Sequence, residues 1–273
     1  GHLGRLAVEA LLERGVAPSD IRATGRATER LADLADRGGQ VLRVDRDDEA
    51  AVADAVRGAA SVLLVSGTEP GRVEQHRRVV EAAREAGVEQ LVYTSGPHAR
   101  GSSVRLLADH AATEELLETS GVPHTVLRNA WYVENYTGQV ETYRAHGMVG
   151  SAGEGRVSLA PRREYAEAAA VVLTTDGHLG KVYELGGEAH TLAEVAAVIG
   201  ETIGQEVAYT DVPVEQLQQV LAGAGVPAPM DAVLADVDRG IAAGELLVPT
   251  TDLERLLGRP ATDLRQAVKE ALA

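Results

Sequence analysis

The chain has 273 residues, a mass of 28.6 kDa and a formal net charge of -15 at pH 7. Hydrophobic residues make up 45% of it, which is ordinary globular usage, and no apolar run approaches the roughly 20 residues that span a bilayer. The absence of cysteine excludes disulfides, thiolate nucleophiles and zinc-thiolate sites. The acidic balance without a basic patch argues against a nucleic-acid partner. Because no basic segment followed by an apolar stretch opens the chain, we expect a cytoplasmic protein.

Short β-branched runs alternate with helical patterns through the first two thirds of the chain. The predicted strands are residues 21–24, 40–44, 61–65, 90–94, 125–128 and 181–185. The first predicted helix begins at Gly1 to Gly4, and a short second one contains Leu31 and Leu34. The others cover residues 50–56, 73–86, 108–120 and 165–173. This alternation predicts βαβ units and a parallel sheet.

The pattern changes after Tyr136. A predicted helix, 137–146, leads into a glycine-rich stretch, 147–155, which lacks a following Lys-Ser or Lys-Thr and is therefore predicted to be a mobile surface turn rather than a phosphate-binding loop. Thr191 and Glu194 form a capping box that starts a helix to residue 203. A strand at 207–210 and helices near 214–221, 230–242, 251–257 and 262–272 complete the chain. We predict a first domain over residues 1–135, to which about 156–185 returns, and a smaller second domain over 136–273.

Small and polar residues follow the carboxyl ends of the predicted strands, where ligands bind in open α/β sheets. These candidates are Gly1 to Gly4, Arg26, Asp45, Ser66 to Thr68, Thr94 with Ser95, and Arg128 with Asn129. Gly1 and Gly4 stand at the mouth of a helix, where backbone N–H groups and the helix dipole favour a pyrophosphate. A glycine at a helix start is also an ordinary cap, so these two glycines alone are weak evidence for a pyrophosphate site. The polar loops after the other strands support that interpretation.

Five segments together resemble the NmrA-like branch of the atypical short-chain dehydrogenase/reductase family, and in particular the type-two NAD(P)H:quinone oxidoreductases. They are Gly1-His2-Leu3-Gly4, Tyr93-Thr94-Ser95, residues 108–114, the run Arg128-Asn129-Ala130-Trp131-Tyr132-Val133-Glu134-Asn135-Tyr136, and residues 180–185. The resemblance implies an α/β fold with a Rossmann-like, doubly wound parallel sheet and a smaller C-terminal α/β substrate domain. It also implies NADP(H) as cofactor in preference to NAD(H) and a small-molecule quinone as substrate, and it leaves a homodimer open.

The resemblance assigns the site residue by residue. Gly1, His2, Leu3 and Gly4 match the turn under the pyrophosphate, Arg26 the arginine that meets the 2′-phosphate, and Asp45 a residue beside the adenine. Ser66, Gly67 and Thr68 match the loop passing the nicotinamide ribose, with Thr94 and Ser95 beside it, and Asn129, Ala130, Trp131 and Tyr132 match the nicotinamide pocket. Glu134, Asn135 and Tyr136 would lie close to the quinone. The alternatives are a surface arginine for Arg26, a helix cap for Asp45, and core packing for Trp131 and the tyrosines.

The mechanism is expected to differ from the usual carbonyl reduction. That route uses a Tyr-x-x-x-Lys pair, and the only lysines are Lys181 and Lys269. Reduction of a quinone does not need such a strong proton donor, because hydride addition gives a stabilised phenolate that water or a weak donor can protonate. We expect His110, Tyr132 or Asn135 to supply the proton through water. An exposed position on its helix is the alternative for His110.

Other chemistries have little support in the sequence. There is no Gly-x-Ser-x-Gly elbow for a hydrolase, and the histidines lack metal-binding spacing, so we predict no metal site. The alternative to an enzyme is a redox sensor that binds NADP without turnover. The related family also places a strand before the first glycine, so we expect either that residues precede Gly1 in the gene, or that the slot of this strand is filled by another segment or left open with weakened cofactor binding.

Overall fold

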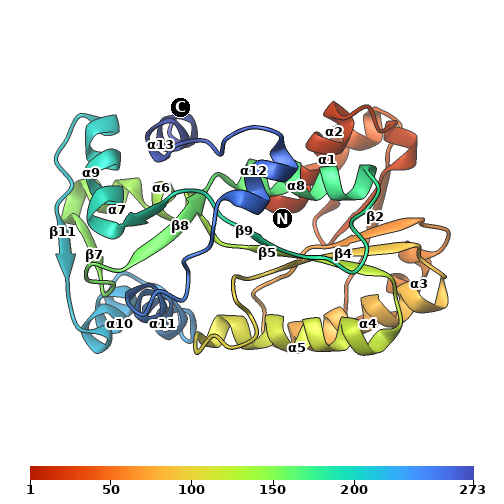
Figure 1. Cartoon of the computed structure of the whole chain (residues 1–273), viewed down its shortest axis with the longest axis horizontal. Helices are drawn as coiled ribbons and strands as arrows, with labels where there is room; N and C mark the ends of the chain where they lie inside the picture. The colour runs from red at the N-terminus through yellow and green to blue at the C-terminus, as the bar shows by residue number, and fades with distance from the viewer. The chain divides into compact units, whose positions relative to one another are not determined.

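The computed structural model describes residues 1–273, the side chain of Arg30 apart, and the chain forms two compact units (Figure 1). Unit 1 comprises Gly1–Ser95, Asp109–Leu127 and Arg163–Tyr183, and unit 2 comprises Gly96–Ala108, Arg128–Arg162 and Glu184–Ala273. These limits differ from the predicted boundary at residue 135, because residues 96–108 and 128–135 belong to unit 2. The roles of the units as cofactor and substrate domains stay a prediction.

Unit 1 alternates strands and helices in chain order. Its strands are β1 (Arg22–Gly25), β2 (Gln40–Arg43), β3 (Ser61–Leu64) and β4 (Gln90–Ser95), with parts of β5 (His124–Asn129) and β9 (Val182–Leu185). Its helices are α1 (His2–Glu13), η1 (Pro18–Asp20), η2 (Thr28–Leu31), α2 (Ala32–Asp36), α3 (Glu49–Val56), α4 (Arg72–Glu85), and most of α5 (Arg105–Ser120) and α8 (Arg162–Thr174). Helices α4 and α5 lie along one face of β4 and β5, and α1 and α8 along the other (Figure 1). This is the layered arrangement that the βαβ pattern predicted.

The strands of unit 1 form two sheets. Strand β1 pairs with β2 in parallel, with Ala23 opposite Val41, and β3, β4, β5 and β9 form the second sheet in that order. The pairing of β3 with β4 is parallel, with Leu63 opposite Val92. Within the described part of the chain no strand joins β1 to β3.

The core of unit 1 holds the carboxyl ends of β3 and β4 in place. Val80 of α4, Leu91 of β4 and Leu117 of α5 expose no surface, and they pack in one cluster with residues of α3 and β3. Fully burying a side chain of this size contributes about 1.5–3 kcal/mol. The loops that follow β3 and β4 therefore start from fixed positions.

Unit 2 is built from short strands and helices. Its strands are β6 (Trp131–Tyr132), β7 (Met148–Gly150), β8 (Arg156–Ala160), β10 (Ala189–Thr191) and β11 (Tyr209–Asp211). Its helices are α6 (Glu134–Thr137), α7 (Val140–His146), α9 (Leu192–Ile203), α10 (Val214–Gly223), α11 (Met230–Ala242), α12 (Thr251–Leu257) and α13 (Leu264–Ala271). Strand β8 lies between β10 and β6, antiparallel to the first and parallel to the second. None of the helices that the structure describes is both long and apolar enough to cross a membrane.

The glycine-rich stretch 147–155 is not the mobile surface turn that was predicted. Met148 and Ala152 are 2% and 1% exposed, and β7 pairs in parallel with β11, placing Val149 opposite Thr210. The side chain of Asp238 also accepts a hydrogen bond from the backbone N–H of Ser151 at 2.8 Å. The prediction was wrong because the partner strand lies about sixty residues further along the chain, beyond the reach of any local pattern.

The capping box of α9 is confirmed. The Thr191 hydroxyl accepts from the backbone N–H of Glu194 at 3.1 Å, and the Glu194 carboxylate accepts from the backbone N–H of Thr191 at 3.0 Å. Two backbone donors that a helix start leaves open are thereby satisfied. The predicted helix 137–146 is instead divided into α6 and α7 by Gly138 and Gln139.

Candidate functional site

The turn at the start of the chain leads directly into α1, and Gly1 is the residue that precedes this helix. No side chain among the described residues caps it. A Cβ added at Gly1 would meet no atom within 4 Å, and one at Gly4 would meet only Val65 Cγ2, at 3.9 Å. His2 is exposed, whereas Leu3 is 8% exposed and packs inward. Glycine at these two positions therefore leaves the first turn of α1 without a β-carbon that would obstruct a close approach to the backbone.

Arg26 follows the end of β1 and is paired with Glu69 from the loop after β3. Arg26 Nη2 lies 2.5 Å from Glu69 Oε1, and the Arg26 side chain is 68% exposed. The backbone N–H of Glu69 holds the pKa of that carboxyl below its ordinary value, against the effect of burial, and Arg26 lowers it further. The cation predicted to meet a phosphate thus already holds a carboxylate.

The structure brings together the loops that follow β3 and β4. The backbone N–H of Ser66 donates to Thr94 Oγ1 at 3.0 Å, and Arg72 Nη1 donates to the carbonyl of Gly67 at 2.8 Å. Thr68 lies in the same loop and is half-buried. Asp45 accepts from the backbone N–H of Asp47 at 3.1 Å and so stabilises its own turn. The helix cap proposed as its alternative is instead Asp48, which accepts from the backbone N–H of Ala51.

His110 is not the exposed helix residue that was the alternative to a proton donor. Its side chain is buried, at 7% exposure, and Nδ1 lies 2.8 Å from the hydroxyl of Tyr93. Burial, together with the charge of Arg72, lowers the pKa of His110 to about 3, so the ring is neutral at pH 7. A neutral imidazole is a poor acid, so the lowered pKa disfavours the proton-donor role. Ser95 is also buried, and its hydroxyl donates to Glu114 Oε1 at 2.6 Å.

Asn129 ends β5 and carries a buried amide side chain. It is 4% exposed, and neither Oδ1 nor Nδ2 has a hydrogen-bond partner among the described residues. Leaving a buried polar group unpaired costs about 1–3 kcal/mol. A carboxamide ligand would satisfy both atoms with two hydrogen bonds. The chemistry is compatible with the nicotinamide that the resemblance assigned to Asn129, and this assignment stays a prediction.

The residues after Asn129 have mixed roles. Ala130 is buried and its backbone N–H donates to the carbonyl of Leu185 at 2.8 Å. Trp131 is half-buried and packs against the core cluster of unit 2, and Tyr136 belongs to that cluster. Core packing, the alternative for these aromatic residues, thus accounts for Tyr136. Burial raises the pKa of Tyr132, and the charge of Arg162 acts against this rise.

Arg162 joins this group, although no motif in the sequence identified it. Its guanidinium carbon lies 4.8 Å from the centre of the Tyr132 ring. Its backbone N–H donates to both oxygens of Glu134, at 2.9 and 3.0 Å, so Glu134 serves as a cap of α8. Asn135 Oδ1 lies 3.5 Å from Arg162 Nη2. The only available signal was the position of Arg162 behind Pro161 at a helix start, which is typical of many surface arginines.

The side chains that the structure describes include no group of three or more His, Asp or Glu placed to hold a metal ion. In unit 1, a helix N-terminus, an arginine and hydroxyl-bearing loops have the chemistry that binds phosphate groups. In unit 2, the amide of Asn129 has the chemistry that binds a carboxamide.

Comparisons with known proteins agree with this chemistry. Residues 1–176 match the family model described as NAD(P)H-binding. The chain is 39% identical over 271 residues to quinone oxidoreductase 2 of Escherichia coli, covering 98% of this chain and 94% of that protein.

Two solved structures are also similar over the whole chain. The crystal structure of the E. coli NADPH-dependent quinone oxidoreductase complexed with NADPH gives a TM-score of 0.95 at 38% identity, covering 100% of this chain and 97% of that one. The triphenylmethane reductase of Citrobacter complexed with NADP(H) gives a TM-score of 0.92 at 35% identity, with the same coverage. Together these matches confirm the Rossmann-like α/β fold predicted from the sequence. The chain belongs to the NAD(P)H-binding, NmrA-like oxidoreductase family.

Proposed function

We propose that the chain is an NADPH-dependent oxidoreductase that transfers a hydride to a quinone. The observation that carries this proposal is the 39% identity to quinone oxidoreductase 2 of E. coli over 94% of its length. The similar solved structure is of an NADPH-dependent quinone oxidoreductase with NADPH bound. A redox sensor without turnover has no observation in its favour.

The residues of the chain divide the binding of the cofactor between them. The open N-terminus of α1 would receive the pyrophosphate, and Arg26 the 2′-phosphate after releasing Glu69. Asn129 would hold the nicotinamide carboxamide and thereby orient the ring. NADPH, when bound, supplies the hydride. Catalysis then depends on holding the two rings in contact and excluding water.

The proton that completes the reduction comes from water in this proposal. His110 is neutral and bonded to Tyr93, and burial raises the pKa of Tyr132, so neither is a strong acid at pH 7. Asn135, half-buried beside Arg162, and Tyr132 would orient the water. Such a weak donor suffices because the reduced quinone is a stabilised phenolate.

Turnover of NADPH with a simple benzoquinone tests the proposal. We expect steady loss of the reduced nicotinamide absorbance with the purified full chain, well above the rate of the same mixture without protein. Tight NADP binding with no turnover across a panel of quinones would contradict the enzyme and leave the sensor.

A further inference from the structure

Both the backbone and the guanidinium of Arg162 contact residues that are expected to lie close to the quinone. Glu134 accepts from its backbone N–H, which fixes where α8 begins, and the ring of Tyr132 lies 4.8 Å from the guanidinium carbon. Both contacts arise within unit 2, from α6 and β6. A cation stacked on an aromatic face keeps its N–H groups in the plane of the guanidinium, directed past the ring edge.

Arg162 also differs from two other arginines of unit 2 in its electrostatics. Arg128 pairs with Glu184 and Arg156 pairs with Glu194, each at 2.8 Å. Arg162 forms no ion pair within the described part of the chain, and the Glu134 carboxylate is engaged by its backbone N–H. Its side chain is half-buried, so water compensates the charge only partly. A half-buried cation with spare donors is suited to an anionic or strongly polar acceptor.

Of the neighbouring side chains, Glu134 carries a negative charge, and its carboxylate accepts from the backbone N–H of Arg162. Tyr132 stays protonated because burial raises its pKa, and Asn129 and Asn135 are amides. Arg162 is thus the positive group of this set.

We propose that Arg162 is a catalytic residue, whose guanidinium binds the quinone oxygen on which negative charge develops. The inference rests on the proposed function. Hydride addition transfers one proton and two electrons to the quinone, so the reduced nicotinamide becomes the oxidised cation and the quinone becomes a hydroquinone monoanion. A second proton from water then gives the neutral hydroquinone. The N–H groups of Arg162 donate more strongly to the monoanion than to the neutral quinone, which lowers the barrier.

Substitution of Arg162 tests this role through turnover. Arg162→Met removes the charge at similar length, and we expect kcat to fall by about 100-fold while NADPH binding stays unchanged, as for the loss of one oxyanion donor. Arg162→Lys should recover part of the loss. Arg156→Met, which removes an exposed arginine on β8, is the matched control and should leave kcat unchanged.

The dependence on the quinone separates catalysis from a structural role. Electron-poor quinones stabilise the monoanion themselves, so Arg162→Met should slow them least and electron-rich quinones most. The slope of log kcat against quinone reduction potential should therefore be steeper in the variant. An equal loss across the series would overturn the proposal.

Binding of a stable phenolate provides a readout without turnover. With oxidised cofactor present, para-nitrophenolate should bind the wild-type chain about 10-fold more tightly than Arg162→Met, whereas neutral para-nitroanisole should bind both alike. Equal phenolate binding by both chains would refute the inference.

Two further outcomes keep the inference separate from the proposed function. If the wild-type chain turns over no quinone, the proposed function fails, and phenolate binding still tests Arg162. If Arg162→Met does not fold, Arg162→Lys carries the test, because it should retain phenolate binding and the slope of the wild-type chain; loss of both would count against the proposal.

Discussion

Polar side chains of the candidate site are paired in unit 1, whereas two in unit 2 are not. Arg26 holds Glu69, and His110 is bonded to Tyr93. In unit 2, by contrast, Asn129 has no partner for either amide atom and Arg162 forms no ion pair among the described residues. A paired group stabilises the cofactor-free fold, whereas an unpaired buried group destabilises it until a ligand arrives. The candidate arginine of unit 1 is thus paired with a carboxylate, and the candidate amide of unit 2 has no partner among the described residues.

Asp238 is a carboxylate to which the same comparison applies. Its substitution is expected to have the largest effect, a change in the pH dependence of the free energy of unfolding. Asp238 is half-buried in unit 2, accepts from the backbone N–H of Ser151 and has no ion pair in the described chain. Burial raises its pKa from 3.8 to about 6, with Asp211 adding to the rise. Since the folded chain holds this proton more tightly than the unfolded chain, the stabilisation is present below pH 3.8 and is lost as the pH rises through about 6. The loss amounts to roughly 3 kcal/mol at most.

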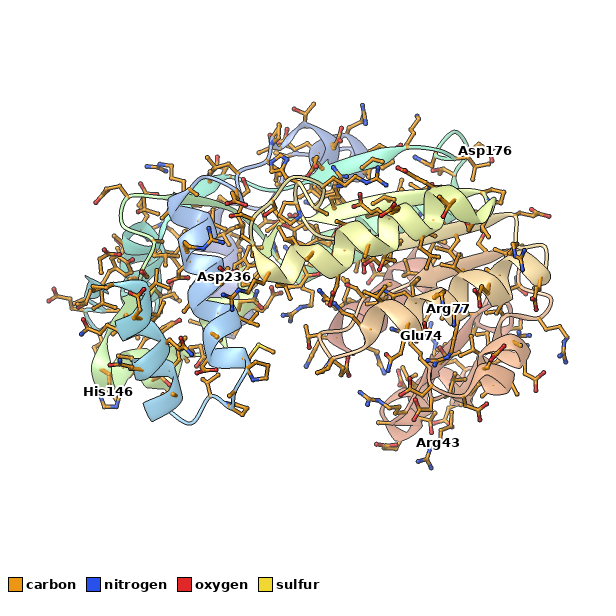
Figure 2. The ribbon with its side chains drawn as sticks, turned by 90° about the horizontal axis from the view of Figure 1, so that it is seen from below. Arg43, Glu74, Arg77, His146, Asp176 and Asp236 are labelled. Carbon is orange, nitrogen blue, oxygen red and sulfur yellow. The ribbon has the colours of Figure 1, made fainter. Side chains whose placement is uncertain are left out.

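Asp238→Asn should remove this pH dependence, because the amide oxygen can still accept from Ser151. We expect a higher free energy of unfolding at pH 7 and a flatter profile between pH 3.8 and about 6, measured by denaturant unfolding. Asp176→Asn, at an exposed position of unit 1 (Figure 2), is the control and should follow the wild-type curve. Parallel curves for Asp238→Asn and wild type would show that Asp238 is not held protonated.

Asn129→Leu tests whether the amide without a hydrogen-bond partner in unit 2 binds the cofactor. Loss of two carboxamide hydrogen bonds should weaken NADPH binding by about 100-fold, or about 2.7 kcal/mol, in a fluorescence titration. The cofactor-free chain should lose no stability, because an unpaired buried polar group is replaced by an apolar one. Gln139→Leu, at an exposed position, is the control for added apolar surface. Unchanged NADPH affinity would refute the assignment of Asn129 to the nicotinamide.

Arg26→Ala tests the arginine of unit 1 that is paired with Glu69, and a smaller effect on NADPH affinity is expected. Because Arg26 must release Glu69 before it meets a phosphate, the net gain is small, and NADPH binding should weaken by about 10-fold with NADH little affected. Arg77→Ala removes an arginine that pairs with Glu74 on α4 (Figure 2) and should alter neither affinity. Equal loss of both cofactors, or of neither, would contradict the role of Arg26 in selecting NADPH.

Local sequence signals predicted the elements that carry them within a few residues. The alternation of β-branched runs with helical patterns located β1 to β4 and the helices between them, and the Thr191 capping box located the start of α9. The run from Asn129 to Tyr136 identified the family. Such features depend on neighbours in the chain, and they can therefore be read without the fold.

Features that depend on distant partners escaped prediction. Strand β7 pairs with the distant strand β11, and the buried His110 is hydrogen-bonded to Tyr93 of β4. Arg162 carries no motif, and its importance emerges only where β6 pairs with β8 and brings Tyr132 close to the start of α8. In each case the deciding contact joins residues from separate elements.

The sequence by itself determined the fold class, the family and the loops at the strand ends, because hydrophobic periodicity and short motifs are local properties of the chain. The tertiary structure decided which polar groups are paired. It assigned Glu69 to Arg26 and left the amide of Asn129 without a partner. That distinction depends on burial and on contacts between distant residues, and these set the free energy of each polar group.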